Sequence, residues 1–156
     1  MIIREYREGD AAGLTKLVRT SITVLGTRDY DEEQLRTWAA RFSDDTPLKK
    51  RLGDGRLVLV AETEGGQPAA FIDLEADGHI DFLYASPAAA GSGAVEALYR
   101  ALEERARMAA HSRLYTEASE MARRFFKRRG FRVLGRRDFD MDGVPMHNFA
   151  MEKRLG

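Results

Sequence analysis

Apolar residues recur every three or four positions in two stretches near the N-terminus, which is the spacing of helices that bury one face. The first stretch runs from Asp10, a residue type that caps helices, to about Thr20, and the second opens at Asp31. Thr46 and Pro47 favour one further helical turn. The apolar positions are Leu14, Leu17 and Val18 in the first stretch and Leu35, Trp38, Ala39 and Phe42 in the second.

Shorter apolar runs bounded by turn residues predict strands. Glycine-containing turn signals, Gly65-Gly66 and Asp77-Gly78, separate three of these runs, so we expect an antiparallel meander. The predicted strands cover 2–6, 57–63, 69–75 and 79–85.

The second half of the chain adds two helices and three strands. Ser119 is a good helix cap, Gly130 a helix stop, and Asp142-Gly143 a hairpin turn. No repeat or linker interrupts the chain, so we expect one mixed α/β (α+β) domain over residues 1–156. The predicted elements are a helix to about His111, a strand at 113–117, a helix at 120–129 and a hairpin of 131–140 with 144–153.

Composition narrows the class of protein. The 156 residues are 44% hydrophobic and 32% charged, and no apolar run approaches the length of a membrane span. There is no cysteine, so a disulfide framework and a thiolate nucleophile are excluded. The first residues lack the apolar core of a signal peptide, and we expect a cytoplasmic protein.

The 25 basic and 25 acidic residues balance overall but are unevenly placed. From Leu57 to Tyr99 there are seven acids and no Lys or Arg, whereas Arg123 to Arg137 contains eight Lys or Arg and no acid. Both segments are typical of solvated faces. Alternatively, the acidic segment faces a cationic ligand and the basic segment an anionic one.

Glycines mark the start of the helix that follows the meander, in the run "SPAAAGSGAVEAL". Gly91 and Gly93 would let a phosphate approach the backbone at the positive end of that helix, although on spacing alone such a glycine pair is more often a plain tight turn. The run lacks the Lys-Ser/Thr of a Walker loop. Glu96 also stands where a dinucleotide fingerprint needs its third glycine.

The order strand, "SPAAAGSGAVEAL", helix, strand, "EASEMARRFFKRRGF" resembles the GNAT superfamily of N-acetyltransferases. The stretches "HIDFLYASP" and "RDYDEEQLRTWA" look like its YafP-like subgroup. The resemblance implies a mostly antiparallel central sheet of about seven strands, with helices on both faces and a splayed cofactor cleft. It also implies acetyl-CoA as cosubstrate, no metal, and direct attack by a primary amine.

Family members grip the cofactor diphosphate with a loop that reads Gln/Arg-x-x-Gly-x-Gly/Ala. Here Ala90 stands at the first position and Val95 at the last, while the central Gly93 is kept. The main-chain groups of residues 83–85 would face the pantetheine arm. The resemblance assigns cofactor contacts to Leu83, Tyr84, Ala85, Ala90, Gly91, Ser92, Gly93, Ala94, Val95, Ser119, Phe125 and Phe126.

The catalytic groups are less directly assigned. Many relatives carry a Tyr at the position of Phe126 to protonate the leaving thiolate, so Tyr84, Tyr115 or water would replace it. His79 and Asp81 alternate onto one face of the predicted strand, and one of them would be the base that frees the amine, unless both are structural. The resemblance places the acceptor pocket between residues 18 and 38, with Ser21, Arg28, Tyr30 and Trp38 as its lining.

Two other functions stay open at this point. The departures at Ala90, Val95 and Phe126 also suit a module that binds acyl-CoA without catalysis. The basic stretch suits a nucleic-acid-binding module, although the balanced net charge argues against it. We expect a small or peptidic amine as partner, allow for a homodimer, and expect neither nucleic acid nor membrane.

Overall fold

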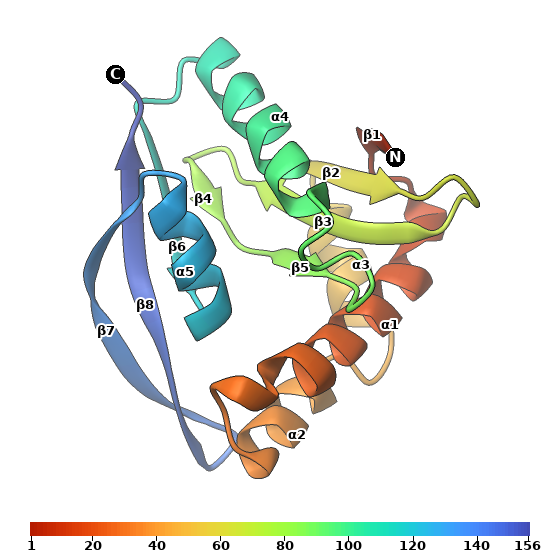
Figure 1. The fold of residues 1–156 in the computed structure, drawn as a ribbon, viewed down its shortest axis with the longest axis vertical. Coiled ribbons are helices and arrows are strands. Elements are labelled where there is room, and N and C mark those ends of the chain that lie inside the picture. Colours follow the sequence, from red (N-terminus) through yellow and green to blue (C-terminus); the bar gives the residue numbers. More distant parts are fainter.

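The computed structural model describes residues 1–156 and contains five α-helices and eight strands (Figure 1). The helices are α1 Ala11–Thr20, α2 Glu32–Ala40, α3 Thr46–Leu52, α4 Ala94–Met108 and α5 Glu120–Arg128. The strands are β1 Ile2–Glu5, β2 Leu57–Glu62, β3 Pro68–Leu74, β4 His79–Ile80, β5 Leu83–Ala85, β6 Arg113–Ala118, β7 Arg132–Met141 and β8 Val144–Arg154.

The strands form two four-stranded halves, ordered β1-β2-β3-β5 and β4-β6-β8-β7. All pairings are antiparallel except that of β4 with β6, which is parallel. Figure 1 shows the halves side by side, with the β7–β8 hairpin curving along one side of the molecule. The predicted mixed, mostly antiparallel sheet is therefore confirmed.

The prediction of one strand over residues 79–85 was wrong. The run splits into β4, which pairs with β6, and β5, which pairs with β3. The cause is the buried carboxylate of Asp73 on β3. Its Oδ1 accepts the backbone N–H groups of Asp81 at 2.8 Å and Phe82 at 2.7 Å, in place of a regular strand ladder. This split makes eight strands rather than the expected seven.

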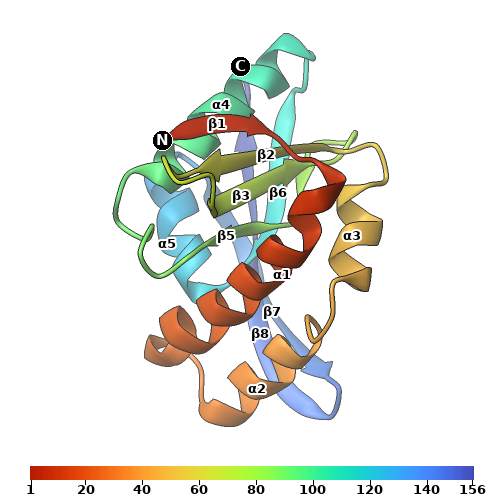
Figure 2. The ribbon, with the colours of Figure 1, turned by 90° about the vertical axis from the view of Figure 1, so that its right-hand side faces the viewer.

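Helices cover both faces of the sheet, as expected (Figures 1 and 2). Helix α4 packs on β3 and β2, while α1 contacts β3 and β5. Helix α5 contacts β6, β7 and β8 of the other half. Two clusters of buried apolar side chains result, one beneath α4 and α5 and one among α1, α2 and α3. No helix combines the length and the apolar character needed to cross a membrane.

Two of the three predicted helix caps form, but the Asp10 carboxylate bonds to Arg4 and to Arg7 N–H and not to an amide of α1. The Asp31 carboxylate accepts from Gln34 N–H at 2.8 Å, and Ser119 Oγ accepts from Ala122 N–H at 3.3 Å. One feature was not predicted: the end of α1 continues into a π-helical turn, Ser21–Leu25. Such turns are rare and frequently occur at functional sites.

Candidate functional site

The sheet opens between β5 and β6. Strand β4 pairs with β6 as far as Ile80 and Thr116, and Thr116 Oγ1 donates to the Ile80 carbonyl at 2.7 Å. Beyond this point β5 is paired only with β3, and β6 only with β8. The expected splay of the central strands is therefore present, and it leaves one edge of β5 without a neighbouring strand.

Two cavities meet at this opening. The first, which we call the glycine-loop cavity, has a volume of about 200 Å³ and lies among the π-helical turn, β5, the glycine loop and α5. Of the predicted cofactor contacts, eight line it: Leu83, Tyr84, Ala85, Ala90, Gly91, Val95, Ser119 and Phe125. Ser92, Gly93 and Ala94 belong to the same loop but do not line the cavity, and Phe126 does not line it either.

The glycine loop presents backbone donors. Gly91 and Gly93 have φ values of 77° and 94°, which other residues rarely adopt, and a Cβ at either position would meet no atom within 4 Å. The N–H groups of Gly91, Gly93, Val95 and Glu96 donate no hydrogen bond within the chain. These free donors lie at the positive end of the 15-residue helix α4, which is a favourable environment for an anion.

The second cavity, which we call the hairpin cavity, has a volume of about 380 Å³ and is bounded by α2, α3, β6 and the β7–β8 hairpin. The two cavities share six lining residues at the opening of the sheet: Tyr30, Trp38, Leu83, Tyr84, Ser119 and Ala122. Of the predicted acceptor contacts, Tyr30 and Trp38 thus lie at the junction. Ser21 lines only the glycine-loop cavity, and Arg28 lines neither.

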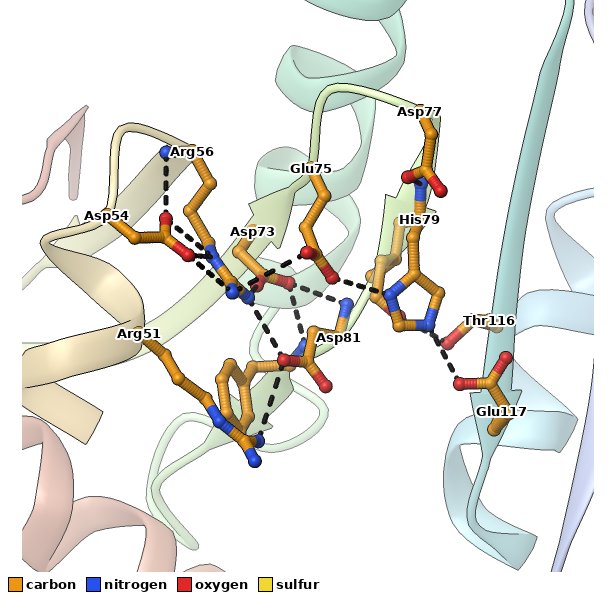
Figure 3. A network of polar contacts seen from close by, with 12 residues as sticks. Arg51, Asp54, Arg56, Asp73, Glu75, Asp77, His79, Asp81, Thr116 and Glu117 are labelled. Atoms are coloured by element: carbon orange, nitrogen blue, oxygen red, sulfur yellow. Dashed lines mark hydrogen bonds and ion pairs between the residues drawn. The ribbon is translucent and has the colours of Figure 1, made fainter. Parts of the chain in front are cut away.

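Asp81 lines the hairpin cavity, and its carboxylate is held by arginines. Arg56 Nη1 donates to Asp81 at 3.0 Å and to Asp73 at 2.6 Å, and Arg51 lies 3.7 Å from Asp81 (Figure 3). The Arg56 side chain is almost fully buried. Burial raises the pKa of Asp73 to about 6, even though Arg56 and the backbone amides favour its charged form.

His79 is placed differently from the prediction. It lines neither cavity, and its ring lies between two carboxylates, with Nδ1 at 2.6 Å from Glu75 and Nε2 at 2.8 Å from Glu117 (Figure 3). The hydrogen bonds to Glu117 and Glu75 raise the pKa of His79 to about 9, against the opposing effect of burial. The imidazole is therefore charged at neutral pH and has no lone pair with which to accept a proton.

The expectation that His79 and Asp81 share one strand face fails for the same reason as the single strand. The backbone turns at Asp81 and Phe82, where Asp73 holds the two amides. His79 consequently points toward β6, whereas Asp81 points toward Arg51 of α3 and Arg56, the residue before β2 (Figure 3).

The aromatic residues at the junction are tightly packed. The Tyr84 ring stacks on Phe71 with centroids 6.1 Å apart and lies 6.3 Å from Trp38. Burial raises the pKa of Tyr84, so its phenol stays protonated at neutral pH. Phe126 is 1% exposed, packs against Phe131 in the core and lines the hairpin cavity.

The sequence prediction missed several charged residues that line the cavities. Among them, Arg128 lines the glycine-loop cavity, whereas Glu117 and Arg137 line the hairpin cavity. A signal for the arginines was present in the basic stretch, but it did not separate them from their neighbours. The structure distinguishes them from four other arginines of the stretch, which form ion pairs within the protein. These pairs are Arg123 with Glu120, Arg124 with Asp29, Arg132 with Glu152 and Arg136 with Asp138.

The acidic segment from Leu57 to Tyr99 does not form the uncompensated negative surface that would face a cationic ligand. Arg56 neutralises Asp73 and Asp81, Arg4 pairs with Glu62, and His79 bridges two further carboxylates. The cations come from positions outside the segment or from its histidine, which is why a count along the chain overstated the negative charge.

The site thus combines a splayed mixed sheet, free amides beside one cavity and a second cavity that adjoins the first. Comparison with known proteins gives the class of the protein: a family model described as an acetyltransferase (GNAT) domain matches residues 26–153. The chain belongs to the GNAT family of N-acetyltransferases, and its fold is the GNAT fold.

Individual relatives agree with this assignment. The chain is 29% identical over 149 residues to the uncharacterised N-acetyltransferase YafP of Escherichia coli K12, covering 96% of this chain and 93% of YafP. A GCN5-related N-acetyltransferase from Rhodopseudomonas palustris is 34% identical and superposes with a TM-score of 0.91, covering 99% and 95% of the two chains. The PaiA N-acetyltransferase of Thermoplasma acidophilum, solved in complex with coenzyme A, has a TM-score of 0.77 at 20% identity, covering 99% and 98%.

Proposed function

We propose that this protein transfers the acetyl group of acetyl-CoA directly to a primary amine while both substrates are bound. The observation that carries the proposal is the meeting of the two cavities at the β5–β6 opening, through six shared residues. A donor in the glycine-loop cavity and an acceptor in the hairpin cavity would touch there, so no covalent enzyme intermediate is needed.

The glycine loop supplies the features that acetyl-CoA requires. The free N–H groups of Gly91, Gly93 and Val95 suit the diphosphate, and Arg128 offers a guanidinium in the same cavity. The main-chain groups of Phe82 and Ser86 bond to β3. The alternation of an antiparallel pair then turns those of Leu83 and Ala85 toward the opening, where the amide groups of the pantetheine arm can pair with them.

The chemical step needs a base, because a protonated amine has no lone pair for attack. We assign this role to Asp81, which lines the hairpin cavity, and not to His79, which is charged and faces Glu75 and Glu117. The amine proton passes to Asp81 directly or through water. The C–N bond then forms as the carbonyl becomes an oxyanion, which a main-chain N–H of residues 83–85 stabilises.

Collapse of the tetrahedral intermediate breaks the C–S bond and releases the CoA thiolate, and the attacking nitrogen loses its second proton to water or to that thiolate. Phe126 has no proton to donate, whereas Tyr84 lines both cavities and is protonated at neutral pH. We assign Tyr84 as the hydrogen-bond donor to the leaving sulfur. His79 acts at a distance by clamping β4 to β6 below the opening, through Glu117.

Release of free thiol from acetyl-CoA, followed across a panel of primary amines, tests the proposed function. We expect amine-dependent release in the wild type, and in Tyr84→Phe a lower kcat with an unchanged CoA affinity. CoA binding without thiol release for any amine would instead support the acyl-CoA-binding module. Absence of CoA binding at millimolar concentration would contradict both functions.

A further inference from the structure

The charges that line the hairpin cavity are of two kinds. Its acids already have cationic partners in the protein: Asp81 is bonded to Arg56, and Glu117 lies 2.8 Å from His79. Its arginines are less fully paired. Arg41 reaches only the exposed Asp142 at 3.3 Å, and Arg51 lies 3.7 Å from Asp81.

Arg137 is the least paired of the cavity's cations. Its guanidinium donates to Asn148 Oδ1 at 3.2 Å and forms no ion pair with any carboxylate of the chain. Asn148 also lines the cavity and is the cross-strand partner of Arg137 on β8. A guanidinium has five N–H donors, so Arg137 keeps most of its donors for a ligand.

The register of the strands places Arg137 on the same face of the sheet as Glu117. Glu117 pairs with Ala150 of β8, and Asn148, two residues earlier on β8, pairs with Arg137. Positions two apart on a strand point to one face, so both charges belong to one wall. The hydrogen bond with His79 lowers the pKa of Glu117, and the positive charge of Arg137 adds to this effect.

We infer that the amine acceptor carries an anionic group, a carboxylate or a phosphate-like oxyanion, which Arg137 binds while the amine lies toward Asp81. This inference rests on the proposed function and names the acceptor's class within it. A guanidinium recognises both kinds of oxyanion in a bidentate manner, and it is the commonest side chain for that purpose. Arg41 and Arg51 make the surrounding rim positive, which also attracts an anion.

The test compares primary amines that share a three-carbon skeleton and differ in the terminal group: 3-aminopropanoate, 3-aminopropylphosphonate and 3-aminopropanol. Each is titrated calorimetrically into the CoA-loaded protein, and thiol release from acetyl-CoA is measured in parallel. We expect at least one anionic amine to bind, and to be turned over, about tenfold or more better than the neutral alcohol. The carboxylate and phosphonate arms show which oxyanion the site prefers.

Substitutions at Arg137 test whether this residue causes the preference for anionic amines. Arg137→Gln is expected to remove the preference by raising the Kd and KM of the anionic amines about tenfold to a hundredfold. The 3-aminopropanol constants should be unchanged, and Arg137→Lys should recover part of the loss. The control is Arg136→Gln, since Arg136 is the neighbour on β7, pairs with Asp138 and lines neither cavity.

Equal binding of the anionic and neutral amines, or equal losses for all three in Arg137→Gln, would overturn the inference. Anionic amines that bind through Arg137 without thiol release would uphold the inference and contradict the proposed catalysis. Thiol release that is as fast with the neutral alcohol would uphold the catalysis and contradict the inference.

Discussion

The carboxylate of Asp73 accepts the backbone N–H of Phe82 at 2.7 Å, and this bond lies at the point where the central strand leaves β6. Asp73 is fully buried and is also bonded to Arg56 at 2.6 Å. One side chain on β3 thus fixes the turn that separates β4 from β5. The opening in which the two cavities meet depends on that separation.

We therefore predict that Asp73→Ala lowers the free energy of unfolding by about 3–5 kcal/mol, because it leaves the buried Arg56 and two amides short of a partner. Asp54→Ala is the matched control, since Asp54 binds the same guanidinium at 2.9 Å but is half-exposed, and it should cost at most about 1 kcal/mol. Urea unfolding measures both. Similar losses of unfolding free energy in the two variants would mean that the buried bonds of Asp73 stabilise the fold no more than the bond of the half-exposed Asp54 does.

We predict that the free energy of unfolding depends on pH through the titration of His79. Its pKa rises from 6.5 to about 9 in the folded protein, so the native state binds its proton more tightly than the unfolded chain does. The stabilisation is complete below about pH 6.5 and is lost as the pH rises through about 9. Because one pKa unit corresponds to about 1.4 kcal/mol, the loss amounts to at most about 3.5 kcal/mol.

The measurement is urea unfolding of the wild type and of His79→Gln at several values between pH 6 and pH 9.5. The difference in unfolding free energy between the two proteins should shrink across this range. A constant difference would mean that His79 is not held as an imidazolium by Glu75 and Glu117.

The glycine loop is tested at Gly93. Gly93→Asp places a side chain and a negative charge in the open space in front of the free amides. Loss of two hydrogen bonds to a charged group costs about 3 kcal/mol or more, so CoA affinity measured by calorimetry should fall at least about a hundredfold.

Gly143→Asp is the control, because Gly143 also has a positive φ, 88°, and open space around its Cβ position, but lies in the β7–β8 turn. Its variant should bind CoA as the wild type does. If both variants bind CoA normally, the diphosphate does not lie against the loop.

Asp81 is tested as the base by Asp81→Asn, which keeps the size and polarity of the side chain. We expect kcat/KM to fall about 10² to 10⁴-fold and the acidic limb of its pH profile to disappear, with little change in CoA affinity. Asp54→Asn removes a different carboxylate from Arg56 without touching either cavity, and it should keep both the rate and the pH limb. Wild-type rates in Asp81→Asn would leave Glu117, which lines the same cavity, as the alternative base.

Local signals in the sequence predicted the helices and the glycine loop well, because those features are determined by neighbouring residues. Asp31 and Ser119 cap their helices, and Gly91 and Gly93 adopt the positive φ that favours glycine. The resemblance to the GNAT family then predicted the mostly antiparallel sheet, the helices on both faces and the splay, which the structure confirms.

Interactions between distant residues were not predictable in this way. The alternating run from His79 to Ala85 is typical of one strand, and only the buried Asp73 on the neighbouring strand shows that it breaks. In the same way, Arg128 and Arg137 look like any other members of a basic stretch until the fold pairs four of those members with acids and places these two in the cavity linings.

A crystal structure with a bisubstrate conjugate of CoA and a primary amine would show whether donor and acceptor meet at the β5–β6 opening. We expect the diphosphate to lie against the amides of Gly91 and Gly93 and the acyl carbon to lie between Leu83 and Ser119. The amine portion should extend into the hairpin cavity toward Asp81. A conjugate whose two halves lie on the same side of the sheet, or whose acyl carbon lies away from the six shared residues, would contradict the account.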